Sequence, residues 1–257
     1  MRLPCLLVLA TTVVISPAWT QQQQAPPPQA WRVVETQVAP AQIGAYRRNI
    51  TGLVKIAEAA KAPASQAWFA YTTENRQIIA RRVERNAILA NPTAPLREAQ
   101  PEAYQKWIES LIPATTIQLV TLRNEIWVEA PEWSYVAPNA PATPGGTSVA
   151  EVHLAPGQGA AFDSVRKDFV ALRKRIGYPY SVLAFRVVLG EPRVVFVTFY
   201  DTREAFFGTN AMGRLIQQAN AQADWDAMIP RLVRPMAGEW KTSLWNYATD
   251  LSYNPSN

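Results

Sequence analysis

The second half of the chain carries the apolar spacing of one long helix between several strands. Apolar residues at steps of three and four place one buried stripe on a helix that begins near Pro156: Phe162, Val165, Phe169, Leu172 and Ile176. Runs rich in β-branched and aromatic residues predict strands at 149–154, 181–189, 193–200 and 241–247. A second helical region is predicted over 203–236, with breaks near 220–223 and at Pro230.

The first half predicts the same elements in the same order. Strands are expected at 33–38, 66–72, 77–84 and 117–128, with a helix over 41–61 and further helices between 86 and 112. Each half therefore has the order strand, helix, strand, strand, helix, strand. This is the order of the split βαβ, or ferredoxin-like, unit.

The two halves also align residue by residue. An offset of 116 pairs residues 38–86 with 154–202 without a gap, and Pro63 then lies over Pro179. Near the end the offset is 118, which pairs Trp127 with Trp245 and Ser134-Tyr135 with Ser252-Tyr253. Shared prolines and tryptophans at fixed offsets indicate an internal repeat.

Two such units in one chain resemble the dimeric α+β barrel superfamily, which includes NIPSNAP-like, EthD-like and antibiotic-biosynthesis monooxygenase-like proteins. The resemblance covers residues 31–255 and depends on element order. It implies an α+β fold of two tandem ferredoxin-like (βαββαβ) repeats, whose antiparallel sheets pack as an intramolecular barrel. Element order supports a fold and leaves the function open.

The ends of the repeats are marked by composition. Residues 1–20 combine Arg2, a short apolar run and small residues, as in a secretory signal peptide. Residues 21–30 form a Gln- and Pro-rich spacer, and the Pro- and Gly-rich residues 138–147 form a linker. The repeats are then residues 31–137 and 148–257, and a periplasmic or secreted location is expected.

Composition excludes several classes of chemistry. Cys5 is the only cysteine and falls in the predicted signal peptide, while His153 is the only histidine, so no metal site is predicted. The net charge is +5 and the cations are scattered, unlike the basic stripe of a nucleic-acid binder. Gly157-Gln158-Gly159 resembles the start of a dinucleotide loop, but Phe162 replaces the third glycine. No cofactor, nucleic-acid partner or membrane anchor is predicted.

Glu151, His153 and Tyr200 are the candidate catalytic residues. Glu151 and His153 are two apart on a predicted strand and so share a face, where the carboxylate is expected to favour the protonated imidazole. Imidazole and phenol can each donate or accept a proton. Tyr200 takes the place of Glu84 in the first repeat. The alternative interpretation is a hydrogen-bonded strand histidine with solvated neighbours and no catalytic role.

Candidate binding residues follow from the same comparison of repeats. Glu35 and Gln37 occupy the positions of Glu151 and His153, so both repeats are expected to present a polar strand face where the sheets meet, together with Arg82. Trp127 and Trp245 are equivalent, which is typical of core positions. Trp68 aligns with Ala184 in the second repeat, so the two repeats differ at this position. The alternative role for this tryptophan is to line an aromatic ligand pocket.

These residues favour an exported protein that binds a small, partly apolar molecule or a protein partner, as a monomer or homodimer. The superfamily resemblance implies a different possibility, an oxygenase that needs no cofactor or uses haem. A third is a structural role, in which the second repeat completes the sheet of the first.

We expect the mature protein to begin near residue 19 or 21 and to carry no lipid, because Cys5 precedes the apolar run. N-terminal sequencing and mass measurement of the exported protein test this. A protein recovered from the cytoplasm with Met1 in place would contradict it.

Overall fold

A computed structural model describes residues 28–83, 93–111, 119–140 and 144–255. The predicted signal peptide, most of the spacer and Glu84 lie outside the described residues. None of the helices in the described ranges is long and apolar enough to cross a membrane.

The first repeat contains the predicted elements. Its strands and helices are β1 (Ala30–Val38), α1 (Ile43–Ala59), β2 (Trp68–Thr73), β3 (Arg76–Val83), α2 (Ala94–Ala99), α3 (Pro101–Leu111) and β4 (Leu119–Glu129). Pro40 starts a short 3-10 turn before α1, where its missing N–H costs nothing. The hairpin between β2 and β3 turns at Glu74, at a positive φ of 46°.

The second repeat follows the same order from Gly146. Its elements are β5 (Gly146–Val152), α4 (Gly159–Arg175), β6 (Val182–Leu189), β7 (Val194–Tyr200), α5 (Arg203–Phe207), α6 (Met212–Gln218), α7 (Gln222–Val233) and β8 (Lys241–Tyr247). The predicted break near 220–223 is confirmed. The predicted break at Pro230 is wrong, because α7 continues through it to Val233. Met228 and Leu232 are buried on either side of Pro230, and their packing offsets the backbone hydrogen bond that proline removes.

All eight strands form one closed antiparallel barrel, in the order β1-β3-β2-β8-β5-β7-β6-β4. Within each repeat the strands pair as in a ferredoxin-like sheet. The two sheets join where β4 pairs with β6 and β2 pairs with β8. Each repeat thus supplies the edge strands that the other lacks, and the chain closes the barrel without a second copy. The α+β barrel predicted from the element order is confirmed.

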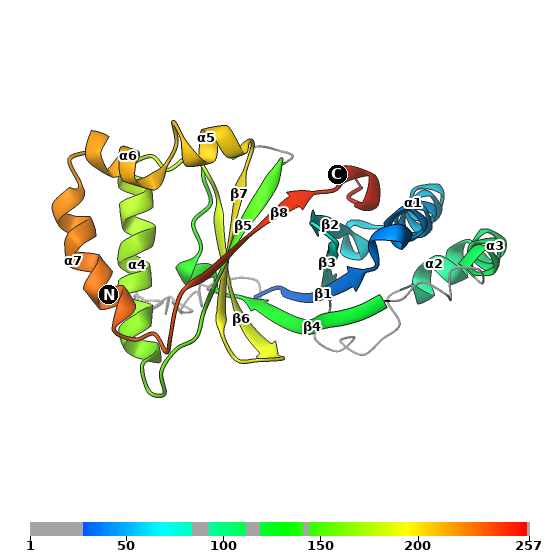
Figure 1. Ribbon diagram of the computed structural model, residues 1–257, viewed down its shortest axis with the longest axis horizontal. Coiled ribbons are helices and arrows are strands. Elements are labelled where there is room, and N and C mark those ends of the chain that lie inside the picture. Colours follow the sequence, from blue (N-terminus) through cyan, green and yellow to red (C-terminus); the bar gives the residue numbers. More distant parts are fainter. Residues whose placement is uncertain (1–27, 84–92, 112–118, 141–143, 256–257) are drawn as a thin grey trace, which may run out of the picture.

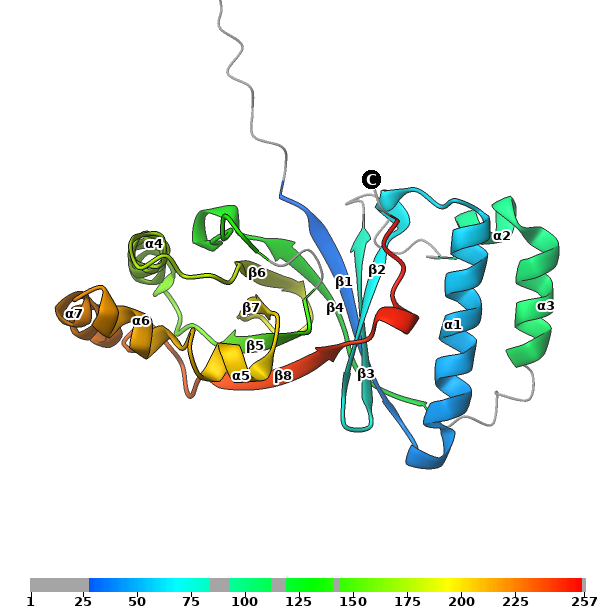
Figure 2. The same ribbon diagram turned by 90° about the horizontal axis from the view of Figure 1, so that it is seen from above.

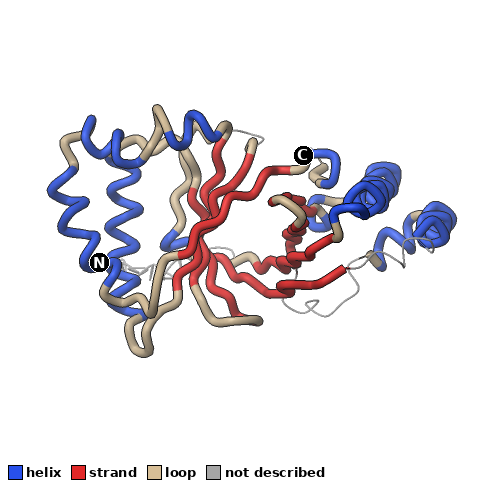
Figure 3. The backbone as a smooth tube through the Cα atoms, viewed as in Figure 1, coloured by secondary structure: helices blue, strands red, loops and turns tan. Residues whose placement is uncertain are grey.

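The helices of the two repeats cover opposite outer sides of the barrel (Figures 1 and 2). Figure 3 shows the strands as one central body between the two helical layers. The stripe predicted on α4 is buried against the second sheet, with Phe162 and Val165 fully covered. Trp68 and Leu96 belong to the smaller cluster under α1.

One buried charge on α4 has no anionic partner among the described residues. Arg166 is 1% exposed, and its guanidinium lies 3.7 Å from the ring centroid of Phe196. Burial, and then the nearby Arg173, hold the pKa of Arg166 well below its ordinary value. The aromatic face replaces part of the lost hydration through a cation–π contact.

Separate halves are expected not to fold as stable monomers, because each would expose the seam edges of its sheet and one apolar sheet face. Expression of residues 30–138 and 148–257, followed by chemical denaturation and size-exclusion chromatography, tests this. We expect no cooperative transition from either monomeric fragment and recovery of one when the two are mixed. Two monomers that each unfold cooperatively would refute it.

Candidate functional site

Strand alternation gives the barrel an interior, here called the lumen, with two chemically different ends. On β1 the side chains of Trp31, Val33 and Glu35 face the lumen, while the residues between them face outward. The same change from aromatic to charged occurs along β4, from Trp127 to Arg123, and along β8, from Trp245 to Lys241. Each sheet therefore contributes apolar residues to one end of the lumen and ionic residues to the other.

The apolar end contains a cavity of about 240 Å³, here called the aromatic chamber. Its wall is almost entirely aromatic and aliphatic: Trp31, Val33, Phe69, Tyr71, Ala80, Trp127, Ala140, Pro144, Ser181, Leu183, Phe185, Val197, Phe199, Trp245, Tyr247 and Asn254. Seven of the eight strands of the described barrel contribute side chains, so a bound molecule would contact both repeats. Ligand pockets in proteins commonly have this composition.

Two phenol hydroxyls are the main polar groups of the aromatic chamber. Tyr71 and Tyr247 are cross-strand neighbours whose ring centroids lie 5.6 Å apart. Burial, and then the nearby Tyr247, raise the pKa of Tyr71, so it keeps its proton. Neither hydroxyl has a hydrogen-bond partner among the described residues. Both are therefore available as donors to a ligand oxygen.

Trp127 and Trp245 lie between the two ends of the lumen. They come from equivalent positions of the repeats, their ring centroids are 6.3 Å apart, and their planes are inclined by 29°. Both are nearly fully buried, which confirms their predicted core position. Trp245 lines both the aromatic chamber and the polar pocket at the other end.

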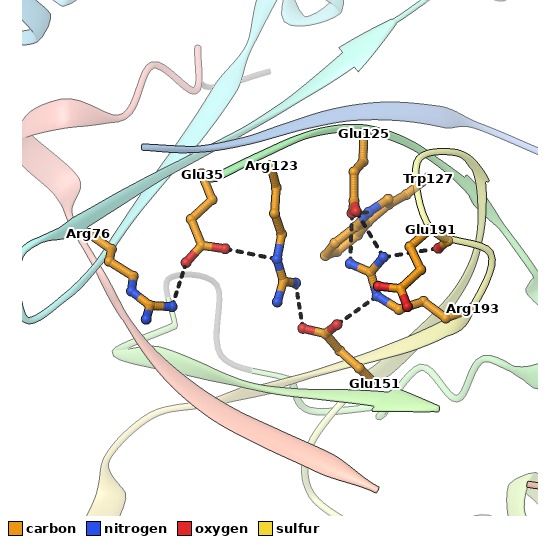
Figure 4. A network of polar contacts seen from close by, with 8 residues as sticks. All are labelled: Glu35, Arg76, Arg123, Glu125, Trp127, Glu151, Glu191 and Arg193. Atoms are coloured by element: carbon orange, nitrogen blue, oxygen red, sulfur yellow. Dashed lines mark hydrogen bonds and ion pairs between the residues drawn. The ribbon is translucent and has the colours of Figure 1, made fainter. Parts of the chain in front are cut away.

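The polar end contains a continuous series of ion pairs, here called the ion chain: Arg76, Glu35, Arg123, Glu151, Arg193 and Glu125. Figure 4 shows these side chains alternating in charge across the lumen. Arg123 Nε lies 3.1 Å from Glu35 Oε2, and its Nη1 bonds Glu151. The three arginines and three glutamates sum to zero charge.

The Arg193 end of the ion chain is the most deeply buried. The Arg193 side chain is 2% exposed and binds Glu125 through two parallel hydrogen bonds of 2.8 and 2.7 Å. Its Nε donates to Glu151 at 2.6 Å. Trp127 Nε1 donates to the second Glu125 oxygen at 2.9 Å, which links the ion chain to the tryptophan pair.

Glu125 is held ionised by these contacts. Burial alone would raise its pKa, but hydrogen bonds from Arg193 and Trp127 and the charge of Arg193 bring the pKa below its ordinary value. For Arg193, burial acts to lower the pKa, and the bonds to Glu125 and Glu151 raise it above its ordinary value. The turn before β7 packs closely against the Glu125 side chain, because a Cβ on Gly190 would lie only 2.8 Å from Glu125 Cγ.

The ion chain partly follows the internal repeat. Glu35 and Glu151 are equivalent at the offset of 116, and Arg123 bridges them. At the offset of 118 the counterpart of Arg123 is Lys241, and that of Glu125 is Ser243. The two glutamates thus keep the symmetry of the duplication, while Glu125 is present on one side only.

The structure does not bring the three candidate catalytic residues together. Because β5 ends at Val152, His153 lies just after the strand, and its backbone carbonyl accepts from Ala237 N at 2.8 Å. His153 Nδ1 is 3.8 Å from Glu191, which is 73% exposed in its side chain. Glu151 is instead held by two arginines of the ion chain.

Tyr200 lies on the opposite face of the sheet from Glu151. It pairs with Gly146, whereas Glu151 pairs with Val195, an odd number of residues away along the strand. The Tyr200 ring stacks on Phe206 at 4.9 Å in the helix-side core, and within the described ranges its hydroxyl has no hydrogen-bond partner. Roles for His153, Glu151 and Tyr200 in catalysis stay predictions.

The four candidate binding residues lie in four different places. Glu35 joins the ion chain, and Gln37, further along β1, is exposed. The Arg82 guanidinium lies 5.3 Å from the ring centroid of Trp31, beside the aromatic chamber. Trp68 faces outward under α1, where its Nε1 donates to Leu251 O at 2.8 Å.

Sequence reasoning missed the arginines of the ion chain and Glu125. The signal was the alternation Arg123-x-Glu125-x-Trp127 along one strand, which places three functional side chains on the same face. Their partners come from other strands, and no local spacing specifies such a pairing. The described residues contain no group of three or more His, Cys, Asp or Glu that could hold a metal ion.

A second apolar cavity lies outside the barrel. It has a volume of about 310 Å³ and lies between the first sheet and α1, lined by Arg32, Val34, Ile50, Leu53, Trp68, Ile79, Arg81 and Thr93. Trp68, the tryptophan that breaks the symmetry of the repeats, thus borders this outer cavity.

Comparison with solved structures identifies the fold. A protein of Fusobacterium nucleatum, provisionally named a monooxygenase, matches with a TM-score of 0.58 at 12% identity, over 87% of this chain and 94% of that one. An anthrone oxidase-like protein matches at 0.51 and 12% identity, over 89% and 94%. A protein of Lactobacillus acidophilus, also provisionally named a monooxygenase, matches at 0.51 and 10% identity, over 89% and 97%. These likenesses show a ferredoxin-like, dimeric α+β barrel fold.

No protein-family model matches the sequence. A search of curated proteins likewise found no match.

Removal of Arg193 is expected to destabilise the protein strongly, because it leaves two buried carboxylates short of their partner. We expect Arg193→Met to lower the free energy of unfolding by about 3–5 kcal/mol in urea. Arg231→Met is the matched control, since Arg231 pairs with Asp168 at the surface and should cost under about 1 kcal/mol. Equal effects of the two substitutions would contradict the assignment.

Proposed function

We propose that this protein is exported and binds a small, largely apolar aromatic molecule in the aromatic chamber. The observation that supports this most is the chamber itself, a cavity walled by aromatic side chains from both repeats, with two phenol hydroxyls that have no hydrogen-bond partner in the described part of the chain. Its volume of about 240 Å³ equals that of roughly eight water molecules in the liquid. A molecule of one or two fused rings suits this volume.

The polar groups of the chamber favour a neutral ligand with a hydrogen-bond acceptor. Tyr71 and Tyr247 would donate to a carbonyl or ether oxygen, while the rest of the wall contacts the ring system. A ligand without that oxygen would leave both hydroxyls unbonded, which costs free energy in an apolar site. Aromatic ketones are therefore the class of ligand that fits best.

The residues that line the aromatic chamber favour ligand binding over acid–base catalysis. No carboxylate or imidazole is among its described lining residues, so a bound molecule would meet no general base. The glutamates of the lumen lie beyond the tryptophan pair and bond arginines. Export is supported by the N-terminal sequence, which has the features of a secretory signal peptide.

A second candidate is an oxygenase-like enzyme, favoured by the names of two proteins of similar fold and by the outer cavity beside Trp68. The similarity to an anthrone oxidase-like protein suggests anthrone as the first substrate to try. Dioxygen uptake with anthrone, together with formation of anthraquinone and water, would establish this second function.

Binding in the aromatic chamber predicts different affinities for two ligands that differ only in a carbonyl group. We expect 1-tetralone to bind more tightly than tetralin, which has the same rings and no carbonyl. Tyr71→Phe should weaken 1-tetralone about threefold to tenfold, the value of one hydrogen bond, and leave tetralin unchanged. Ala80→Trp, which fills the chamber, should abolish binding of both in titration calorimetry.

His153→Gln serves as the control. If the chamber is the site, this variant binds 1-tetralone as the parent does, whereas a site built on His153 would lose at least about tenfold in affinity, or 1.4 kcal/mol. Each variant is compared only if it melts near the parent. Tight binding that survives Ala80→Trp would sink the lumen proposal.

A further inference from the structure

The polar end of the lumen opens into a pocket of its own. It has a volume of about 290 Å³ and is here called the polar pocket: Glu35, Thr73, Glu74, Arg76, Arg123, Glu151, Lys241, Thr242, Ser243 and Trp245. Only Trp245 is shared with the aromatic chamber. A molecule in the polar pocket would therefore be separated from one in the chamber by the tryptophan pair.

Both carboxylate oxygens of each buried glutamate of the polar pocket are engaged by arginine. Glu35 accepts a hydrogen bond from Arg76 at Oε1 and forms an ion pair with Arg123 through Oε2. Glu151 likewise bonds Arg123 and Arg193 through separate oxygens. The remaining carboxylate, Glu74, lies exposed on the turn between β2 and β3.

The arginines of the polar pocket have N–H donors that the glutamates do not use. Arg123 engages the glutamates through Nε and Nη1, which leaves Nη2, and Arg76 uses only Nη1. In Figure 4 the guanidinium ends of Arg76 and Arg123 point to the same side of the ion chain. Arg76 therefore keeps the Nε and Nη2 fork, and Arg123 keeps Nη2, as donors suited to an oxyanion.

Lys241 adds a third cation to the same pocket. It is the first residue of β8 and lies directly beside Glu151 in the register of β5 and β8. It is exposed and has no ion-pair partner among the described residues. The hydroxyls of Thr73 and Ser243 line the same space. The formal charges of the pocket balance, so its preference for an anion comes from the direction of the free donors.

We propose that the polar pocket is a second binding site, which takes a small oxyanion such as a carboxylate or a phosphate group. Arg76, Arg123 and Lys241 hold the anion, and Glu35 and Glu151 fix the orientation of Arg123 between them. The site lies at the place where the two repeats meet and would be incomplete in either repeat alone. It does not depend on the aromatic chamber being occupied.

Titration calorimetry at low ionic strength with inorganic phosphate and with acetate tests the site. We expect binding of at least one of them, with Lys241→Gln weakening it about tenfold, or 1.4 kcal/mol, and Lys241→Arg retaining it. Lys174→Gln is the matched control, because Lys174 is exposed on α4 and lines no described pocket wall. It should bind as the parent does.

The relative affinities of the two probes decide the chemistry. Tighter binding of phosphate assigns a phosphate site, and tighter binding of acetate assigns a carboxylate site. No binding of either anion overturns the proposal, as does equal weakening by Lys241→Gln and Lys174→Gln, which would show only a general charge effect. Arg76→Gln gives a second check, since it frees a Glu35 oxygen and should weaken the anion further.

Discussion

The neutral ion chain across the lumen is the interaction on which the rest of the structure depends. A closed barrel of eight strands must fill its interior, and isolated charges there would be prohibitively costly. Here each buried carboxylate is bonded by two arginines or by an arginine and an indole. Because the ion chain crosses from the first repeat to the second, it also fixes how the two sheets meet.

The ion chain and the tryptophan pair together divide the lumen by chemistry. Glu125 accepts from both Arg193 and Trp127, so the most buried ion pair and the first of the stacked indoles form one unit. On one side of this unit the side chains are aromatic, and on the other they are charged. One barrel thereby offers two sites of opposite preference, which neither repeat could form alone.

Much of the fold could be predicted from the sequence, and little of the site. The stripe from Phe162 to Ile176 and the pairing of Trp127 with Trp245 specify elements and their repetition, because both signals are local or periodic. The ion chain is different, since Arg123 meets Glu35 and Glu151 only after three strands are brought together. His153 is the one histidine of the sequence, yet it lies just beyond the end of β5 and away from the ion chain.

A crystal of the protein pressurised with xenon tests the division of the lumen most directly, because xenon enters dry apolar cavities and avoids polar ones. The account predicts xenon in the aromatic chamber, bounded by Trp31, Tyr71 and Phe199, and none among Glu35, Arg123 and Glu151. Ordered water filling the aromatic chamber, with xenon bound only elsewhere in the molecule, would contradict it.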